Sequence, residues 1–458
     1  MTIQAITTKV ISTLGNKESL VPIMIKDGVD STSLTLKSFK EGGPVEGMDR
    51  AIDEFGTQAI WIGGIPFFKK LIDKTVYKAK NINPAVDPRI IADGEYAKWA
   101  TENAKGIMNN SKVQTVQSAL TDALKDGGKL AKNLFKSKVI IATALTLATF
   151  FSLTKFKQKK TKDTTVNEML AVKKYNGQND SKNTFVKTQT SDVFKEIDDK
   201  FNTTADKTPS FKGKLQSVAD AIMFNPVHNM KIIDAGITTE RLACSRNATE
   251  LAEHAIKEGV FLFFVYGFGG LIENGINKLS EKLLHKPIDL KIDVLMDKEF
   301  KEALKSGKIA EQISKMPAAD KSLTEKLNFI VQNPDNILVK AAKKAGIVGT
   351  VKDAAGKQFV DTSKYIDTKE IETLAKDLLN IDKKYSSSGE TINKFLSKTK
   401  GLKVLSTTAN IAISCFVLGY IIPKLIYKYR EWKTGTTKFH VAENIKEEYK
   451  NENKKDIQ

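Results

Sequence analysis

The sequence predicts a mainly α-helical protein, an internally duplicated pair of apolar-helix units with helical soluble inserts and a minor β-hairpin. Two observations carry this prediction. Four apolar segments stand out from a polar, lysine-rich background, and the first two resemble the last two in the same order. Between them, apolar residues recur at the i, i+3, i+4 spacing that is typical of amphipathic helices.

The apolar segments differ in length, and therefore in whether they can span a membrane. Only the last exceeds the roughly 18 uncharged residues of a membrane span, whereas runs of about 10–14 residues are more often buried or interfacial helices. Lysines flank the second segment and can extend a short span by snorkelling. The sequence therefore leaves open four spans, or two spans (the second and fourth) with two interfacial or buried glycine-bearing helices. The segments are Ala59–Phe68, Val139–Leu153, Val260–Ile272 and Val404–Ile422.

The duplication is predicted from three matches. Upstream, "IKDGVDST" at 25–32 faces "IIDAGITT" at 232–239, and downstream, "KVIIATALTLATFFSL" at 138–153 faces "KVLSTTANIAISCFVL" at 403–418. Between these lies a gap-free match of residues 51–74 with 255–278. Its identical pairs are Ala51/Ala255, Ile52/Ile256, Glu54/Glu258, Gly63/Gly267, Ile72/Ile276 and Lys74/Lys278.

The matches define the expected domain boundaries. Residues 1–154 form the first half, with apolar helices near 56–72 and 138–154. A polar linker rich in Lys, Thr, Asn and Asp follows at 155–214, and within it 191–201 has the pattern of a short amphipathic helix. The second half is 215–430, with apolar helices near 248–278 and 402–427 around a helical insert at 290–400, and a charged tail follows at 431–458.

Local signals place several elements within this plan. Ser322 with Glu325, and Asp367 with Glu370, have the spacing of capping boxes, in which side chains satisfy the free amides of a helix N-terminus. Asn247 and Glu250 repeat the pattern, and the helix they begin is expected to run into the third apolar segment. Thr350–Val360 predicts a hairpin that turns near 353–356.

The net charge of +18 comes mainly from lysine, because only five of the 72 basic residues are arginines (Arg50, Arg89, Arg241, Arg246 and Arg430). Readout of bases and bidentate clamping of phosphates favour arginine, so nucleic-acid binding is not expected as the main function. Dispersed lysine charge suits the surface of anionic lipid. The two cysteines, Cys244 and Cys415, lie too far apart in the sequence to indicate a disulfide framework or a zinc site.

No catalytic, cofactor-binding or metal-binding motif emerges. "DAAGKQF" and "DGGKLAK" lack the first glycine and the hydroxyl of a phosphate-binding loop. "YGFGGLIENG" has Ile272 where a dinucleotide fingerprint needs its third glycine, so helix packing is the better interpretation. The four histidines form no close metal-ligand spacing. A non-enzymatic protein is therefore expected.

Two sets of residues are candidates for a role in the duplicated units. Gly63, Gly64, Gly267 and Gly270 are expected to let helices approach closely. The second set is the repeated carboxylates. In one interpretation, Glu54 and Glu258 lie near helix N-termini, where the helix dipole stabilises their negative charge. In the other, they face each other across a pseudo-two-fold axis and bind a cation or a lysine. Asp27 and Asp234 are expected to lie in a turn or helix cap.

These features favour a membrane-associated protein in scaffolding, membrane organisation or transport. Its expected partners are the lipid bilayer, including anionic lipid through its lysines, and a protein that the sequence does not specify. The alternative is a soluble, cytoplasmic interaction protein whose apolar segments form one buried core. An enzyme would require a cleft in which Glu54, Glu258, Asp27 and Asp234 converge.

Overall fold

A computed structural model gives the fold of the protein. It describes residues 10–15, 19–84, 86–103, 118, 120–124, 126–175, 226–284, 291–352, 358–362 and 364–455. The described chain is mainly helical, with one two-stranded antiparallel sheet. The predicted short helix at 191–201 lies outside the described residues.

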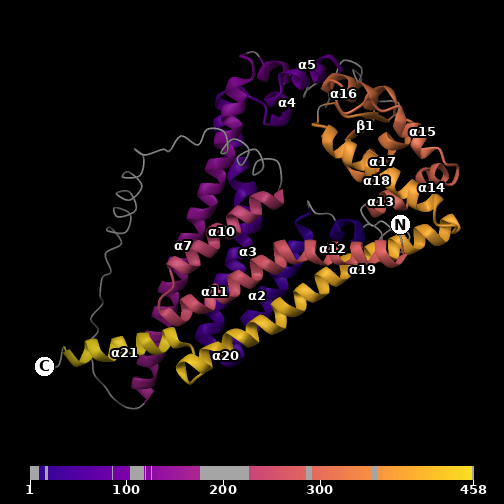
Figure 1. The fold of residues 1–458 in the computed structure, drawn as a ribbon. Coiled ribbons are helices and arrows are strands. Elements are labelled where there is room, and N and C mark those ends of the chain that lie inside the picture. The colour runs from indigo at the N-terminus through magenta and orange to yellow at the C-terminus, as the bar shows by residue number, and fades with distance from the viewer. Residues whose placement is uncertain are drawn as a thin grey trace.

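The long helices form two arms that diverge from a common apex (Figure 1). In the first arm, α3 (Pro44–Ile72) and the π-helical η1 (Asp73–Tyr77) pack against α7 (Lys129–Tyr175). In the second arm, α12 (Phe268–Leu284) packs against α19 (Ile392–Phe416). The remaining elements of this bundle are α2 (Val21–Glu41), α10 (Pro226–Ala243), α11 (Ala248–Leu262), η3 (Phe263–Gly267), η4 (Val417–Ile421), α20 (Ile422–Thr434) and α21 (His440–Lys455).

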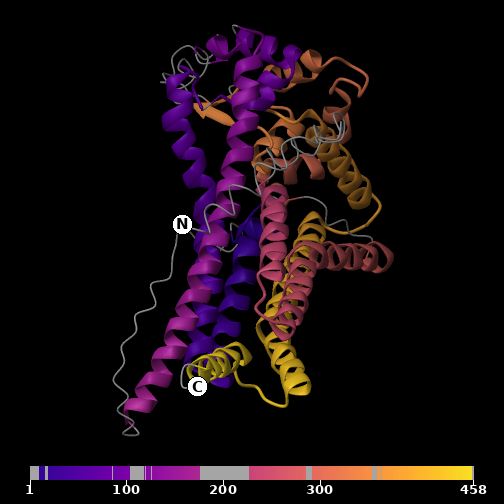
Figure 2. The ribbon, with the colours of Figure 1, turned by 90° about the vertical axis from the view of Figure 1, so that its left-hand side faces the viewer.

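Both inserts fold together into one lobe that joins the far ends of the arms (Figures 1 and 2). The first insert, between the two apolar segments of the first half (residues 75–137), contributes α4 (Pro88–Ala92) and α5 (Gly94–Asn103). The two inserts share a single apolar core, so the lobe depends on both halves of the chain. The second insert contributes α13 (Ile292–Leu295), α14 (Lys298–Lys305), α15 (Ile309–Ser314), α16 (Leu323–Gln332), α17 (Ile337–Ala345), β1 (Thr350–Lys352), β2 (Gln358–Val360) and α18 (Thr368–Ser386).

Two aromatic side chains of α5 link the inserts. The Nε1 of Trp99 donates to Oδ1 of Asn328 at 2.7 Å, and the backbone N–H of Ile366 donates to the hydroxyl of Tyr96 at 2.6 Å. The rings of Tyr96 and Trp99 meet edge to face, and both side chains are buried. These contacts fix the first insert against the second.

Replacing Trp99 with alanine is expected to destabilise the lobe by about 3–5 kcal/mol, because a large buried ring and its hydrogen bond are lost together. Susceptibility of the lobe to limited proteolysis over a temperature series measures this loss. Trp432→Ala is the matched control, since Trp432 is 78% exposed, and it should change stability by no more than about 0.5 kcal/mol. Equal cleavage of the two variants would contradict the role of Trp99.

Several local predictions are confirmed. Ser322 and Glu325 form a full capping box, and the carboxylate of Asp367 accepts from the backbone N–H groups of Lys369 and Glu370. Asn247 caps α11, which continues without interruption through η3 into α12. The hairpin is present as antiparallel strands that pair Thr350 with Val360, while its turn lies outside the described residues.

The predicted linker begins later than expected, because α7 continues to Tyr175. No glycine or proline interrupts the sequence from Lys129 to Tyr175, so nothing in the backbone ends the helix at the apolar boundary. The polar end of α7 also has a packing role, since Lys157, Thr161 and Thr165 are buried. A polar composition was therefore mistaken for a loop.

The bundle reverses the usual distribution of polarity. Its interior holds many buried charged side chains, whereas large apolar side chains such as Phe67, Ile140 and Phe416 are exposed on the arms at 62%, 62% and 57%. Within the described residues, three continuous helices are long and apolar enough to cross a membrane: Lys129–Val172, Ala248–Ser280 and Ile392–Thr434. The first apolar segment, within α3, is not among them, because its short run lies between charged residues such as Glu54 and Lys69.

Candidate functional site: the charged apex

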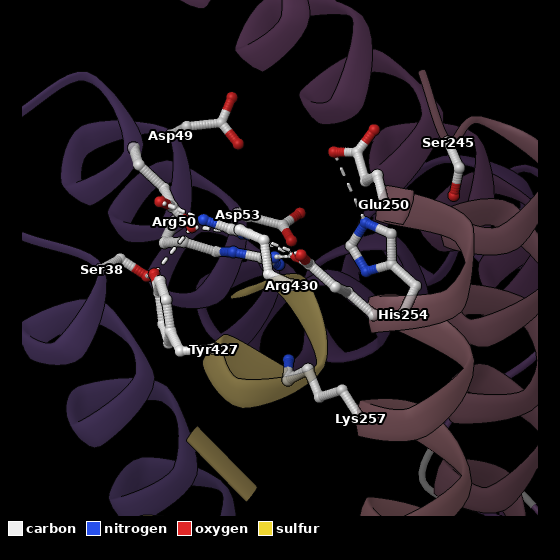
Figure 3. A network of polar contacts seen from close by, with 12 residues as sticks. Ser38, Asp49, Arg50, Asp53, Ser245, Glu250, His254, Lys257, Tyr427 and Arg430 are labelled. Carbon is white, nitrogen blue, oxygen red and sulfur yellow. Dashed lines mark hydrogen bonds and ion pairs between the residues drawn. The ribbon is translucent and has the colours of Figure 1, made fainter. Parts of the chain in front are cut away.

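Charged side chains from six helices and from the loop between α10 and α11 meet at the apex of the bundle, where α3 and α11 begin and α20 ends. Figure 3 shows part of this network, which we call the apex network. Its acidic members are Asp30, Glu46, Asp49, Asp53, Glu54, Glu250, Glu253 and Glu258, and its basic members are Arg50, Lys157, Arg241, Arg246, His254, Lys257 and Arg430.

Two arginines each join α3 to α11. Arg430 of α20 forms bidentate pairs with Glu46 and Glu253, with all four N–O distances between 2.7 and 2.8 Å. Arg246 forms a bidentate pair with Asp49, with two N–O distances of 3.0 Å, and also binds Glu250. The planar guanidinium suits this bridging of two carboxylates, and such charge-assisted pairs are the strongest class of side-chain hydrogen bond.

The repeated glutamates lie deeper, in the middle of the network. Lys257 donates to Glu54 and lies 3.6 Å from Glu258, measured from Nζ to Oε1. Arg241 donates to Glu258 and lies 3.4 Å from Asp53, measured from Nη2 to Oδ2. Each glutamate also has a hydroxyl neighbour on the preceding helix. Ser31 lies 3.4 Å from Glu54, and Thr238 lies 3.5 Å from Glu258.

These positions decide between the two interpretations of Glu54 and Glu258. α3 begins at Pro44 and α11 at Ala248, so both glutamates lie several turns inside their helices. The helix-dipole interpretation is wrong, because that effect fades within the first turn. The glutamates instead accept hydrogen bonds from buried cationic side chains, Lys257 at Glu54 and Arg241 at Glu258.

Asp27 and Asp234 also differ from expectation, since neither lies in a turn or a cap. Asp27 lies within α2 and Asp234 within α10, and the hydroxyl of Tyr266 donates to Asp234. The sequence signal was ambiguous because Asp is common in turns, and only the apolar neighbours of these residues indicated helix.

All four repeated carboxylates line one small cavity. Asp27, Glu54, Asp234 and Glu258 surround it together with Arg241 and Lys257. Its volume of about 20 Å³ is close to the space that one water molecule needs. The convergence that an enzyme would require is therefore present, with Arg241 and Lys257 beside the four carboxylates.

Of the four predicted packing glycines, only Gly64 makes a close contact with another helix. A Cβ there would lie 2.9 Å from Cγ2 of Thr146 on α7, whereas a Cβ at Gly63 or Gly270 would meet nothing within 4 Å. At Gly267 it would meet only the ring of Phe263, one turn earlier in the same helical segment. Gly63 and Gly270 lie on outer faces, so the packing prediction is wrong for them. Close approaches missed by the sequence occur at Gly56, Gly236, Gly269 and Gly419.

The sequence did contain a signal for the apex network. Four of the five arginines (Arg50, Arg241, Arg246 and Arg430) belong to it, in a chain that otherwise uses lysine almost throughout. Arginine is the residue suited to buried ion pairs, because its fork matches a carboxylate and its charge is weakly hydrated. Their rarity could have identified these positions.

Comparison with known proteins adds no relative: no family model, no curated protein and no solved structure matches the chain. Among the residues described, no group of three or more His, Cys, Asp or Glu side chains has an arrangement that could hold a metal ion. The fold and the apex network are therefore the basis for assigning a function.

Proposed function

We propose that this protein is an integral membrane protein with a non-enzymatic, membrane-organising role, in which the arms contact lipid and the lobe lies in water. The observation that carries this proposal is the reversed polarity of the bundle. Exposed apolar side chains on the arms are stable when lipid, not water, surrounds them. The lobe, by contrast, has an ordinary apolar core and exposed charge.

The path of the chain supports one orientation for both halves. α3 and α11–α12 run from the apex to the lobe, and α7 and α19–α20 run back (Figure 1). Both inserts therefore lie on one side of the bundle, where they share their core. Two halves with the same orientation correspond to parallel repeats about an axis along the membrane normal.

The internal duplication is part of this proposal, and equivalent contacts support it. Ser31 with Glu54 corresponds to Thr238 with Glu258 in the sequence match. Extending the match upstream aligns Glu46 with Glu250 and Asp49 with Glu253. In this alignment, Arg430 binds Glu46 and also Glu253, which is the equivalent of Asp49. Arg246 binds the other two carboxylates, Asp49 and Glu250. The match therefore exchanges the two pairs of carboxylates, as expected if a pseudo-two-fold axis relates the two halves.

At the apex, the small size of the internal spaces favours a scaffolding role over transport or catalysis. The central cavity measures about 20 Å³, and another beside Arg430 and His440 measures about 10 Å³. Neither admits a solute larger than water. The bidentate arginines hold the two halves together, which is the geometry of a fixed support.

Extraction with alkaline carbonate tests membrane integration. The expressed chain is expected to stay in the membrane pellet after the wash and to require detergent for release. A chain that washes off is held peripherally by its lysines. A chain that is monodisperse without detergent is soluble, as the alternative interpretation requires, and either result contradicts the proposal.

Lysine substitutions at exposed apolar positions of the arms test lipid contact more directly. Leu405 and Phe416 are each 57% exposed on α19 and its junction with η4. Replacing both with lysine should reduce retention in carbonate-washed membranes if they contact lipid, since a lysine near the bilayer centre costs about 2.5–3.5 kcal/mol. Leu379→Lys, on the lobe surface, is the matched control and should leave retention unchanged. Full retention of the double variant would contradict lipid contact at these positions.

A further inference from the structure

A second, larger cavity lies outside the apex network, where α12 and α19 pass the first turns of α2 and α10. Its volume is about 480 Å³, which is within the range of ligand sites in proteins. Part of its wall is apolar, with Leu14, Ile23, Val227 and Val265. The polar part consists mainly of Lys26, Lys231, Lys403, Ser406, Thr407 and Asn410.

The cavity carries an excess of positive charge. Three lysines face one carboxylate, Glu273, which pairs with Lys403 at 3.3 Å. Lys26 is only 2% exposed, and its ammonium group donates to the carbonyl oxygen of Phe264 at 2.9 Å and to Oδ1 of Asn410 at 3.0 Å. An ammonium group has three donors, so these bonds fix its position and leave one donor for a ligand.

Two helix N-termini add to this charge. α2 begins at Val21 and α10 at Pro226, and their first-turn residues Pro22 and His228 line the cavity. Neither first turn contains an acidic residue to neutralise the positive end of the helix dipole. The positive end of a helix dipole favours an anion such as phosphate.

We propose that this cavity binds a phosphate ester. Lys26, Lys231 and Lys403 neutralise the phosphate, and the hydroxyl groups of Ser406 and Thr407 provide further donors. The volume exceeds that of inorganic phosphate, and the apolar wall receives the esterified part of the ligand. Such a ligand is either the headgroup of a phospholipid or a free phosphate ester. The cavity and its charged side chains are part of the fold whether or not the arms cross a membrane. This proposal is therefore independent of the proposed function.

The test uses the full chain purified in an uncharged detergent. Its thermal midpoint is measured with phosphatidic acid, with phosphatidylcholine and with glycerol phosphate, each titrated to obtain an apparent affinity. If only phosphatidic acid raises the thermal midpoint, the site binds a lipid headgroup. If glycerol phosphate raises it as well, the site binds phosphate esters in general. Failure of both to raise the midpoint overturns the proposal.

Variants then locate the effect. Lys231→Gln changes an exposed lysine of α10 whose ammonium group lies 5.6 Å from the ring centroid of Tyr266, and Lys26→Met removes the buried ammonium. Each is expected to weaken the apparent affinity at least tenfold. Lys446→Met, which removes a surface lysine of α21 far from the cavity in sequence and fold, should retain it. Equal binding by the Lys231→Gln chain and the unaltered chain would show that the lipid acts through general surface charge, and would overturn the proposal even if Lys26→Met fails to fold.

Discussion

Arg430→Met is expected to lower the free energy of unfolding by about 3–5 kcal/mol, because it leaves two buried carboxylates without their main partner. Arg430 is 2% exposed and binds Glu46 and Glu253 through four hydrogen bonds. Methionine fills much of the same space, so the loss measures the missing charge more than a cavity. The thermal midpoint of the detergent-solubilised chain, followed by loss of its monodisperse peak after heating, provides the measurement.

The controls separate charge from packing. Arg89→Met removes an arginine that is 37% exposed and pairs with Asp87, and its expected cost is at most about 1 kcal/mol. Adding Glu46→Gln to Arg430→Met should restore part of the lost stability, since one of the unpaired charges is then removed. If Arg430→Met is no worse than Arg89→Met, the bridge does not hold the apex together.

Elements that depend on near neighbours in the chain could be predicted from the sequence. The caps at Ser322 and Asp367 and the hairpin at Thr350–Val360 each follow from residues within a few positions of one another. The same signals gave the helical character of the inserts. None of them required knowledge of how distant segments pack.

The features that the sequence did not predict are contacts between segments that lie far apart in the chain. The shared core of the two inserts brings Trp99 to Asn328, and the apex brings Glu46 to Arg430. Charged residues such as these usually lie in water, so their sequence pattern indicates exposure. The alignment of the repeated carboxylates, Glu54 with Glu258 and Asp27 with Asp234, anticipated part of the site. Equivalent positions in two matching halves are expected to meet near their common axis.

The end of α7 illustrates the same limit. Its lysines and threonines have the composition of a linker, yet Lys157 lies 3.3 Å from Asp53 and Thr161 donates to Asp49. The buried carboxylates of α3 give these polar residues their partners, and the partners lie more than a hundred residues earlier in the chain. Composition alone cannot distinguish such a helix from a solvated segment.

Lys257→Met is the second substitution with a large expected effect, again about 3–5 kcal/mol. Its ammonium group binds Glu54 and lies 3.7 Å from Asp30 and 3.6 Å from Glu258. Its removal therefore leaves Glu54 and Glu258 to share Arg241, and it takes away the ion pair described for Asp30. The same thermal measurement applies, with Lys446→Met as the exposed control; that lysine pairs only with Glu443 among the ion pairs described and should cost at most about 1 kcal/mol.

The double variant Lys257→Met with Glu54→Gln tests the geometry directly. Once Glu54 is neutral, the centre of the network holds one fewer unbalanced negative charge, and stability should recover by at least half of the loss. Residues that do not touch would instead give additive costs. Additive losses would therefore contradict the placement of Lys257 against Glu54, and with it the interpretation of the repeated glutamates as the ligands of buried cations that join the two halves.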